Sequence, residues 1–144
     1  MSLRSDLFAY WKTKSSITDE FGTSDNMRVY PGMAPSSATF PYATWEIISD
    51  TPFHHLEAAT RITDATMQID VWADTALAAF DGADGFRSAM DGYNEGTMTS
   101  VDVRWIALLD RRDELIPPDD NSENAIYRVS SDYQIFYVTS VPTF

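Results

Sequence analysis

The sequence predicts an α+β fold, in which a mostly antiparallel β-sheet carries two main helices packed on one face. Three observations support this class. Strand-like runs recur along the chain, an amphipathic helical pattern opens it, and a second helical pattern follows Asp74. The expected order is therefore helix, three strands, helix and two strands. With 144 residues the chain can bury one sizeable core, so a single domain is expected over residues 1–144.

The first helix is expected over residues 3–14. Ser2 precedes it and belongs to the residue types that cap helices. Four residues then recur at helical spacing and are expected to dock on the sheet: Leu3, Leu7, Tyr10 and Trp11.

The next stretch alternates short strands with two long loops. A strand over residues 27–30 is expected to stop at Pro31, because proline cannot donate to a sheet. Residues 31–41 are rich in proline and serine and are expected to form a loop, followed by a strand over residues 42–49. A second loop is expected over residues 50–60, which hold both histidines. Loops of this length lean toward functional roles.

Residues 66–73 show the clearest alternation in the chain. Asp70 and Trp72 point to one face and the apolar residues to the other. Two interpretations of Asp70 stay open: a polar contact on an open face, or a subunit interface that also covers Trp72. The same parity on the other strands predicts the sheet core: Met67, Ile69, Val71, Val101, Val103, Val129 and Ile135.

A second helix is expected over residues 75–92, capped by Asp74 or Thr75. Its glycines, Gly82 and Gly85, each cost roughly 1 kcal/mol relative to alanine, so a kink or fraying is expected. A strand over residues 100–109, an acidic loop over 113–124 and a last strand over 127–138 follow. The apolar side of the helix is expected to comprise Ala76, Phe80, Ala83, Phe86 and Met90.

The charge of the chain limits the classes of function. Ten Lys and Arg residues against 22 Asp and Glu residues give a net charge of −12 and a pI near 4.2. Proteins that grip nucleic acid or anionic membranes need a basic patch, so both partners are disfavoured. With no cysteine, the chain has neither disulfides nor thiolate metal sites.

Candidate chemical sites are weak. The sequence His54-His55-Leu56-Glu57 resembles metal ligands, but adjacent histidines in an extended chain point apart and no further His or Cys completes a site. Residues 119–130 resemble a calcium loop, but the sixth and twelfth positions are Asn124 and Ser130 rather than glycine and glutamate. We therefore expect no cofactor, no metal and no catalytic residue. A carboxylate pair acting as acid and base stays open among 22 acidic residues.

Four phrases occur in fixed order along the chain: residues 28–31 (RVYP), 40–45 (FPYATW), 66–73 (TMQIDVWA) and 127–137 (YRVSSDYQIFY). With the two helices, they resemble the tail-completion, or tail-terminator, family of long-tailed bacteriophages. The resemblance implies a structural protein that forms a ring, typically hexameric, on the finished tail tube. Such a ring ends tube polymerisation and offers a surface to the head.

The partners implied by this resemblance are further copies of the chain, the tail tube protein and a head-completion or connector protein. DNA is expected to pass through the lumen without specific binding, and no membrane is involved. The implied location is the host cytoplasm during assembly and then the virion tail. The alternatives are a small cytoplasmic carboxylate-dependent hydrolase or a ligand-binding domain.

A closed ring needs heterologous interfaces, with different surfaces on the two sides of each subunit. The two long loops and the open face of residues 66–73 are expected to supply them. The candidate interface residues are Met33, Phe40, Phe53, His54, His55, Glu57, Asp70 and Trp72.

Overall fold

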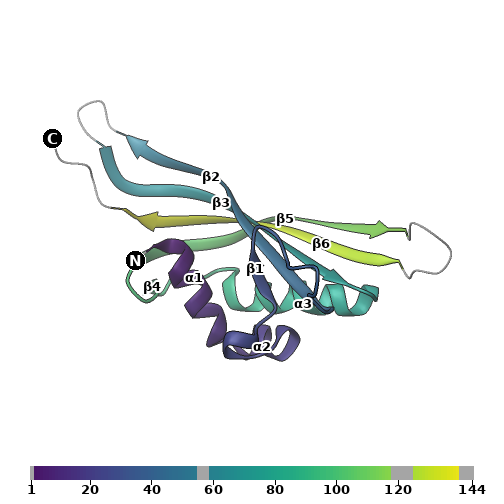
Figure 1. Ribbon diagram of the computed structural model, residues 1–144. Coiled ribbons are helices and arrows are strands. Elements are labelled where there is room, and N and C mark those ends of the chain that lie inside the picture. The colour runs from purple at the N-terminus through teal and green to yellow at the C-terminus, as the bar shows by residue number, and fades with distance from the viewer. Residues whose placement is uncertain (1, 55–58, 118–124, 140–144) are drawn as a thin grey trace.

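The computed structural model describes residues 2–54, 59–117 and 125–139. Within these ranges the chain forms an α+β fold, with one sheet that lies above the helices in the view of Figure 1. The helices are α1 (Leu3–Lys12), α2 (Ser15–Phe21) and α3 (Ala76–Met90), with a 3₁₀ turn at Ser24–Asn26. The strands are β1 (Val29–Pro31), β2 (Tyr42–His54), β3 (Ala59–Ala73), β4 (Gly96–Thr97), β5 (Asp102–Ile116) and β6 (Ile126–Val138).

The sheet is mixed, which corrects the prediction of a mostly antiparallel one. Over the described residues its strand order is β1-β2-β3-β6-β5-β4, and β1 runs parallel to β2 while the other neighbours are antiparallel. The parallel pair arises because the segment over residues 32–41 carries the chain back before β2 begins, so both strands run the same way. Strand alternation alone does not distinguish the two directions.

The long strands extend beyond the expected boundaries and form two arms (Figure 1). Strand β2 continues to His54 and β3 begins at Ala59, so the predicted loop over residues 50–60 is wrong over most of its length. Strand β5 likewise runs to Ile116, into the predicted acidic loop. These arms accommodate polar residues because their strands carry register shifts. Pro52 is tolerated because its part of β2 is an edge of the sheet.

The predicted sheet core is confirmed except at one position. Val101 is half-buried and precedes β5. It lies in the turn before that strand, where its backbone N–H donates to Asp6. The other members are buried and join one cluster with the helices: Met67, Ile69, Val71, Val103, Val129 and Ile135.

Helix α1 begins at a capping box, in which Ser2 and Ser5 each bond the other's backbone N–H. Leu3, Leu7 and Trp11 are buried as predicted. The Trp11 ring meets the rings of Trp45 and Phe86 edge-on, at centroid distances of 5.2 and 5.4 Å. Tyr10 is half-buried and donates to the Ala89 carbonyl at 2.7 Å.

Helix α2, which the sequence pattern did not predict, explains the glycines of α3. A Cβ on Gly85 would lie 2.2 Å from the Ser16 carbonyl oxygen, and one on Gly82 would lie 2.7 Å from Val71 Cγ1. The glycines therefore let α2 and β3 approach α3 closely. Helix α3 runs unbroken from Ala76 to Met90, so the expected kink is not observed. Phe80 was expected on the buried side but is 39% exposed. The side of α3 that carries Gly82 and Gly85 packs against α2 and β3 instead.

Gly85→Ala is expected to destabilise the protein by about 1–3 kcal/mol, although alanine favours helix by about 1 kcal/mol. The added methyl group would meet a backbone oxygen, which cannot rotate away as a side chain could. Chemical denaturation measures the change in unfolding free energy. Ser88→Ala, at an exposed position of α3, is the control and should be neutral or slightly stabilising. An equal gain in both variants would show that α2 does not pack here.

Asp6 is a buried carboxylate that the sequence pattern missed. It is 2% exposed and accepts hydrogen bonds from the backbone N–H groups of Ser100 and Val101, both at 2.7 Å. The Thr99 N–H at 3.3 Å and the Ser100 hydroxyl also donate to it. Burial alone would raise the pKa of Asp6, but these bonds outweigh it and hold the pKa below its ordinary value. Asp6 thus ties α1 to the turn that precedes β5.

Candidate assembly interface

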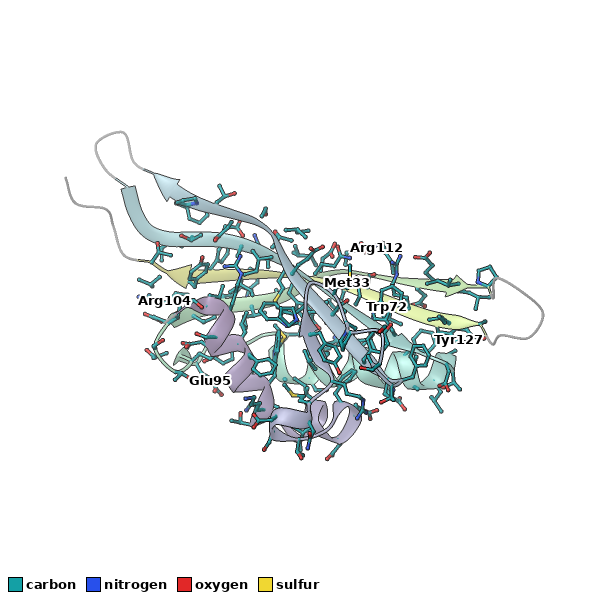
Figure 2. The ribbon with its side chains drawn as sticks, viewed as in Figure 1. Met33, Trp72, Glu95, Arg104, Arg112 and Tyr127 are labelled. Atoms are coloured by element: carbon teal, nitrogen blue, oxygen red, sulfur yellow. The ribbon has the colours of Figure 1, made fainter. Side chains whose placement is uncertain are left out.

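Four of the candidate interface residues meet on the face of the sheet that carries Asp70 and Trp72, here called the open face. The segment over residues 32–41 leaves β1 at Gly32, whose positive φ of 75° suits glycine and whose N–H donates to the Trp45 carbonyl at 2.8 Å. This turn places Met33 beside Trp72 (Figure 2). The other end of the segment brings Phe40 next to Tyr42.

Three side chains stack across the open face and form what we call the aromatic row: Phe40, Tyr42 and Trp72. The ring centroids of Phe40 and Tyr42 are 5.4 Å apart, and those of Tyr42 and Trp72 are 6.2 Å apart. The register causes this stack, because Tyr42 on β2 lies directly opposite Trp72 on β3. The Trp72 indole N–H donates to Thr44 at 3.1 Å, which fixes the ring.

Charged side chains lie next to the aromatic row, on β6 and β5. Arg128 on β6 lies opposite Trp72, and its guanidinium stands 5.3 Å from the Trp72 ring centroid. Arg128 also pairs with Glu114 on β5. The surface across four strands is therefore aromatic at one side and ionic at the other.

A pocket of about 330 Å³ lies between the row and the segment that precedes β2. Met33, which is 84% exposed, stands at its rim, and Asp70 and Trp72 line its wall. Burial raises the pKa of the Tyr42 phenol, so this hydroxyl stays neutral at physiological pH. An exposed thioether beside stacked aromatic rings is typical of protein contact surfaces, in which methionine and aromatic residues are enriched.

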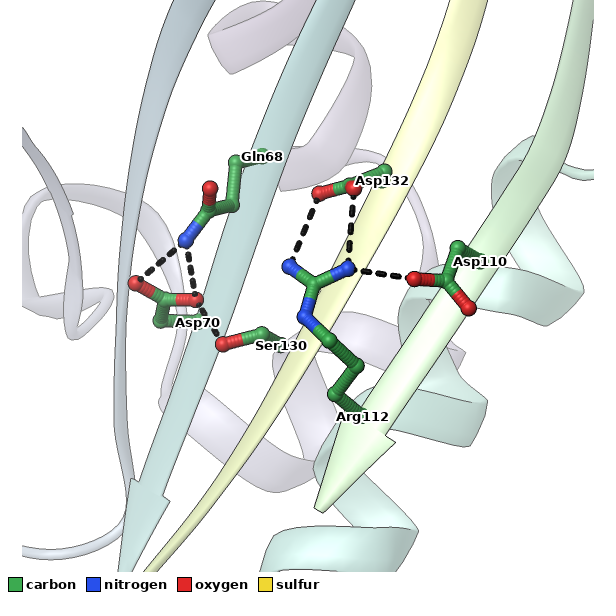
Figure 3. A network of polar contacts seen from close by, with 6 residues as sticks. All are labelled: Gln68, Asp70, Asp110, Arg112, Ser130 and Asp132. Carbon is green, nitrogen blue, oxygen red and sulfur yellow. Dashed lines mark hydrogen bonds and ion pairs between the residues drawn. The ribbon is translucent and has the colours of Figure 1, made fainter. Parts of the chain in front are cut away.

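Asp70 and its neighbours form an intramolecular polar network on the open face (Figure 3). Asp70 accepts from Gln68 Nε2 at 3.0 Å and from the Ser130 hydroxyl. The first interpretation of Asp70, a polar contact on the open face, therefore describes this subunit. The carboxylate faces the pocket as well, so the network holds it in place at the pocket wall.

Arg112 centres a separate cluster of polar contacts beside this one (Figure 3). Its guanidinium donates to both carboxylate oxygens of Asp132, at 3.0 and 3.3 Å, and to Asp110 at 2.5 Å. The hydrogen bonds that Arg112 donates to Asp132 and Asp110 raise its pKa further above its already high value, so it stays charged. Arg112 and Asp110 lie on β5 and Asp132 lies on β6, so this shared cation ties the side chains of two adjacent strands together.

The remaining candidate residues lie elsewhere. Phe53 is at the other end of the sheet, where its ring packs 5.9 Å from that of Phe136. His54 ends β2, and its side chain is not described. His55, Glu57 and the acidic stretch 118–124 lie outside the described residues. In the described ranges, no group of three or more His, Cys, Asp or Glu side chains is placed to hold a metal ion.

Sequence reasoning missed Tyr42 and Arg128, which complete the surface around Trp72. The available signal was the parity of each strand, because Tyr42 and Arg128 share a face with Trp72 once the strands are paired. The pairing itself could not be read from the sequence. It also missed Trp105 and Phe136, whose rings stack at 5.3 Å at the other end of the open face.

The comparison with protein families decides the identity. The family model described as "Tail completion protein gp17" matches residues 5–137, which is nearly the whole chain. The chain belongs to this tail completion family. As a tail completion protein it is a structural component of a virion tail and not an enzyme.

A solved structure agrees with this fold. A chain of the virion of a native gene transfer agent (GTA) particle superposes with a TM-score of 0.70, over 95% of this chain and 95% of that one. The two sequences share 13% identity, so the likeness concerns the fold. No curated protein sequence matches this tail completion protein. Among its described residues, no helix combines the length and apolar character needed to cross a membrane.

Proposed function

We propose that this tail completion protein forms a ring of six copies that caps the phage tail tube, ends tube polymerisation and joins the tail to the head. The observation that carries the proposal is the family match over residues 5–137. The partners are then further copies of the chain, the tail tube protein and a head-completion or connector protein. The chain acts as one domain over residues 1–144, assembles in the host cytoplasm and stays in the virion tail.

The charge of the chain favours a ring through which DNA passes over one that binds DNA. A net charge of −12 on each subunit makes the ring strongly acidic, and phosphates are repelled from such a surface. DNA would therefore cross the lumen without specific binding.

The open face supports a contact with another virion protein. It carries the aromatic row, the exposed Met33 and the ordered carboxylate of Asp70 around one pocket. In the proposal the two main helices, α1 and α3, stay packed on the opposite face, so the row remains available. Met33, Phe40, Asp70 and Trp72 would then contact the tail tube or the head connector, and Phe53, His54, His55 and Glu57 would lie at a separate contact.

Met33→Asp is expected to weaken binding to the tail tube protein about tenfold or more, which corresponds to about 1.4 kcal/mol. The substitution places a charge at the rim of an apolar pocket and beside Asp70. Because Met33 is 84% exposed, folding should not change. Binding to purified tubes measures the effect.

Ser37→Asp is the matched control, because it adds the same charge at an exposed position of the same segment. It should bind tubes like the unmodified protein. Equal binding by all three proteins would remove the pocket from the tube contact, and the same assay with the head connector would then locate it.

A further inference from the structure

The end of the open face farthest from Trp72 carries an apolar surface, which we call the distal patch: Phe53, Ile62, Trp105 and Phe136. Trp105 and Phe136 stack with a centroid distance of 5.3 Å, and Trp105 is 37% exposed. Arg104 lines the same surface and is exposed. It donates to Asp102 at 2.9 Å through Nε, which leaves its terminal NH₂ groups as further donors.

A second apolar surface lies beside the first turns of α3, and we call it the α3 groove. It encloses about 220 Å³ and is lined by Phe80 and Leu115, which are 39% and 55% exposed, and by Tyr127. Asp113 and Glu114 also line it. Small-molecule sites usually measure about 300–1,000 Å³, so this groove suits protein side chains better than a ligand.

The two surfaces cannot meet within one subunit. Figure 2 places Arg104 and Tyr127 at opposite ends of the molecule. They also face opposite ways, because Trp105 shares the open face with Phe136, whereas Asp113 and Leu115 alternate with the open-face residues Arg112 and Glu114. Two different surfaces at opposite ends are what a heterologous, ring-closing contact requires.

The charges of the two surfaces are complementary. The distal patch carries Arg104, which pairs with Asp102 through Nε, and the α3 groove carries the exposed carboxylate of Asp113. Glu114, at the edge of the groove, is already paired with Arg128. Aromatic residues and arginine are enriched in the buried centres of protein interfaces, and complementary charges fix their register. In a chain of net charge −12, a cation beside an exposed aromatic stack provides a specific attraction between copies that otherwise repel each other.

We propose that the distal patch of one subunit packs into the α3 groove of the next, with Arg104 facing Asp113. The inference rests on the proposed ring and names the surfaces that close it. The occupant of the groove is a second copy of this chain. The aromatic row lies outside this contact and stays available for another virion protein.

Charge reversal tests the pairing. Arg104→Glu alone and Asp113→Arg alone should each lower the fraction of ring at least tenfold, because each places like charges in contact. Their equimolar mixture should restore the ring, since alternating subunits then present opposite charges at every contact. The double variant should also form rings. Sedimentation velocity measures the oligomer, and Arg87→Glu on the exposed side of α3 is the matched control.

The outcomes separate the inference from the proposed function. If the unmodified protein and both single variants form rings equally well, or if mixing the variants restores nothing, the pairing is wrong while the ring stands. If the unmodified protein forms no ring alone or with tubes, both the ring and the pairing fail. Circular dichroism should show the same folded spectrum for every variant, because both positions are exposed.

Discussion

Ile69→Asp is expected to abolish folding. Ile69 is 1% exposed at the centre of β3, the strand that lies between β2 and β6. The substitution would bury an unpaired carboxylate among apolar side chains, at a cost above about 5 kcal/mol. Domains of this size are typically stable by only about 5–15 kcal/mol, so little folded protein should remain. Circular dichroism and solubility after expression measure the result.

Two controls separate charge from position. Ile69→Val removes one methylene group and should cost about 0.5–1.5 kcal/mol. Thr66→Asp places the same carboxylate on the open face of the same strand, where the side chain is half-buried, and should fold. A soluble Ile69→Asp protein that melts cooperatively would contradict the position of Ile69 in the core.

Asp6→Ala is expected to lower the unfolding free energy by about 3 kcal/mol or more. The variant leaves the backbone N–H groups of Thr99, Ser100 and Val101 without the carboxylate, and each orphaned donor costs about 1–3 kcal/mol. Glu20→Ala is the control, because its carboxylate makes no comparable set of backbone bonds and its pKa is raised instead of lowered. A loss equal to that of the control would mean that Asp6 does not hold the turn before β5.

The contribution of Asp6 should depend on pH with a defined sign. Its folded-state pKa lies below the ordinary value of 3.8, so the unfolded chain takes up the proton first as pH falls. The stabilisation is complete above pH 3.8 and is lost as pH falls through the lower folded-state pKa. The stability difference between the unmodified protein and Asp6→Asn should therefore be constant near neutrality and shrink in acid. A difference that grows in acid would contradict the assigned hydrogen bonds.

The sequence predicts those parts of the fold that depend on local periodicity. The alternation around Ile69 indicates which side of β3 is buried, and the spacing of Leu3, Leu7 and Trp11 indicates which side of α1 docks. Ser2 and Thr75 cap their helices as expected. These features follow from the geometry of one element at a time.

The features that depend on contacts between two elements could not be predicted from the sequence. The expected weakness of α3 ignored α2, against which Gly85 packs. Asp6 resembles an ordinary surface residue of a first helical turn until residues 99–101 fold against it. The boundaries of the arms depend on strand pairing, which lets Asp50 and Asp113 sit in strands despite their low intrinsic preference.

For the candidate interface residues, too, the sequence indicated single positions, and contacts between strands decide which of them meet. Exposure and composition pointed to Met33, Phe40 and Trp72 separately, and the pairing of β2 with β3 brings them to one pocket. Phe53 falls at the opposite end because β2 continues well past its predicted end, and this extension carries it to Phe136. The described candidates therefore lie at two ends of the open face.

We propose that this tail completion protein caps the tail tube. The most direct measurement is electron microscopy of tail tubes incubated with the protein and then supplied with fresh tube subunits. We expect one ring of six copies at a tube end and no further growth from that end. Binding along the tube wall, or continued growth from ends that carry the protein, would contradict it.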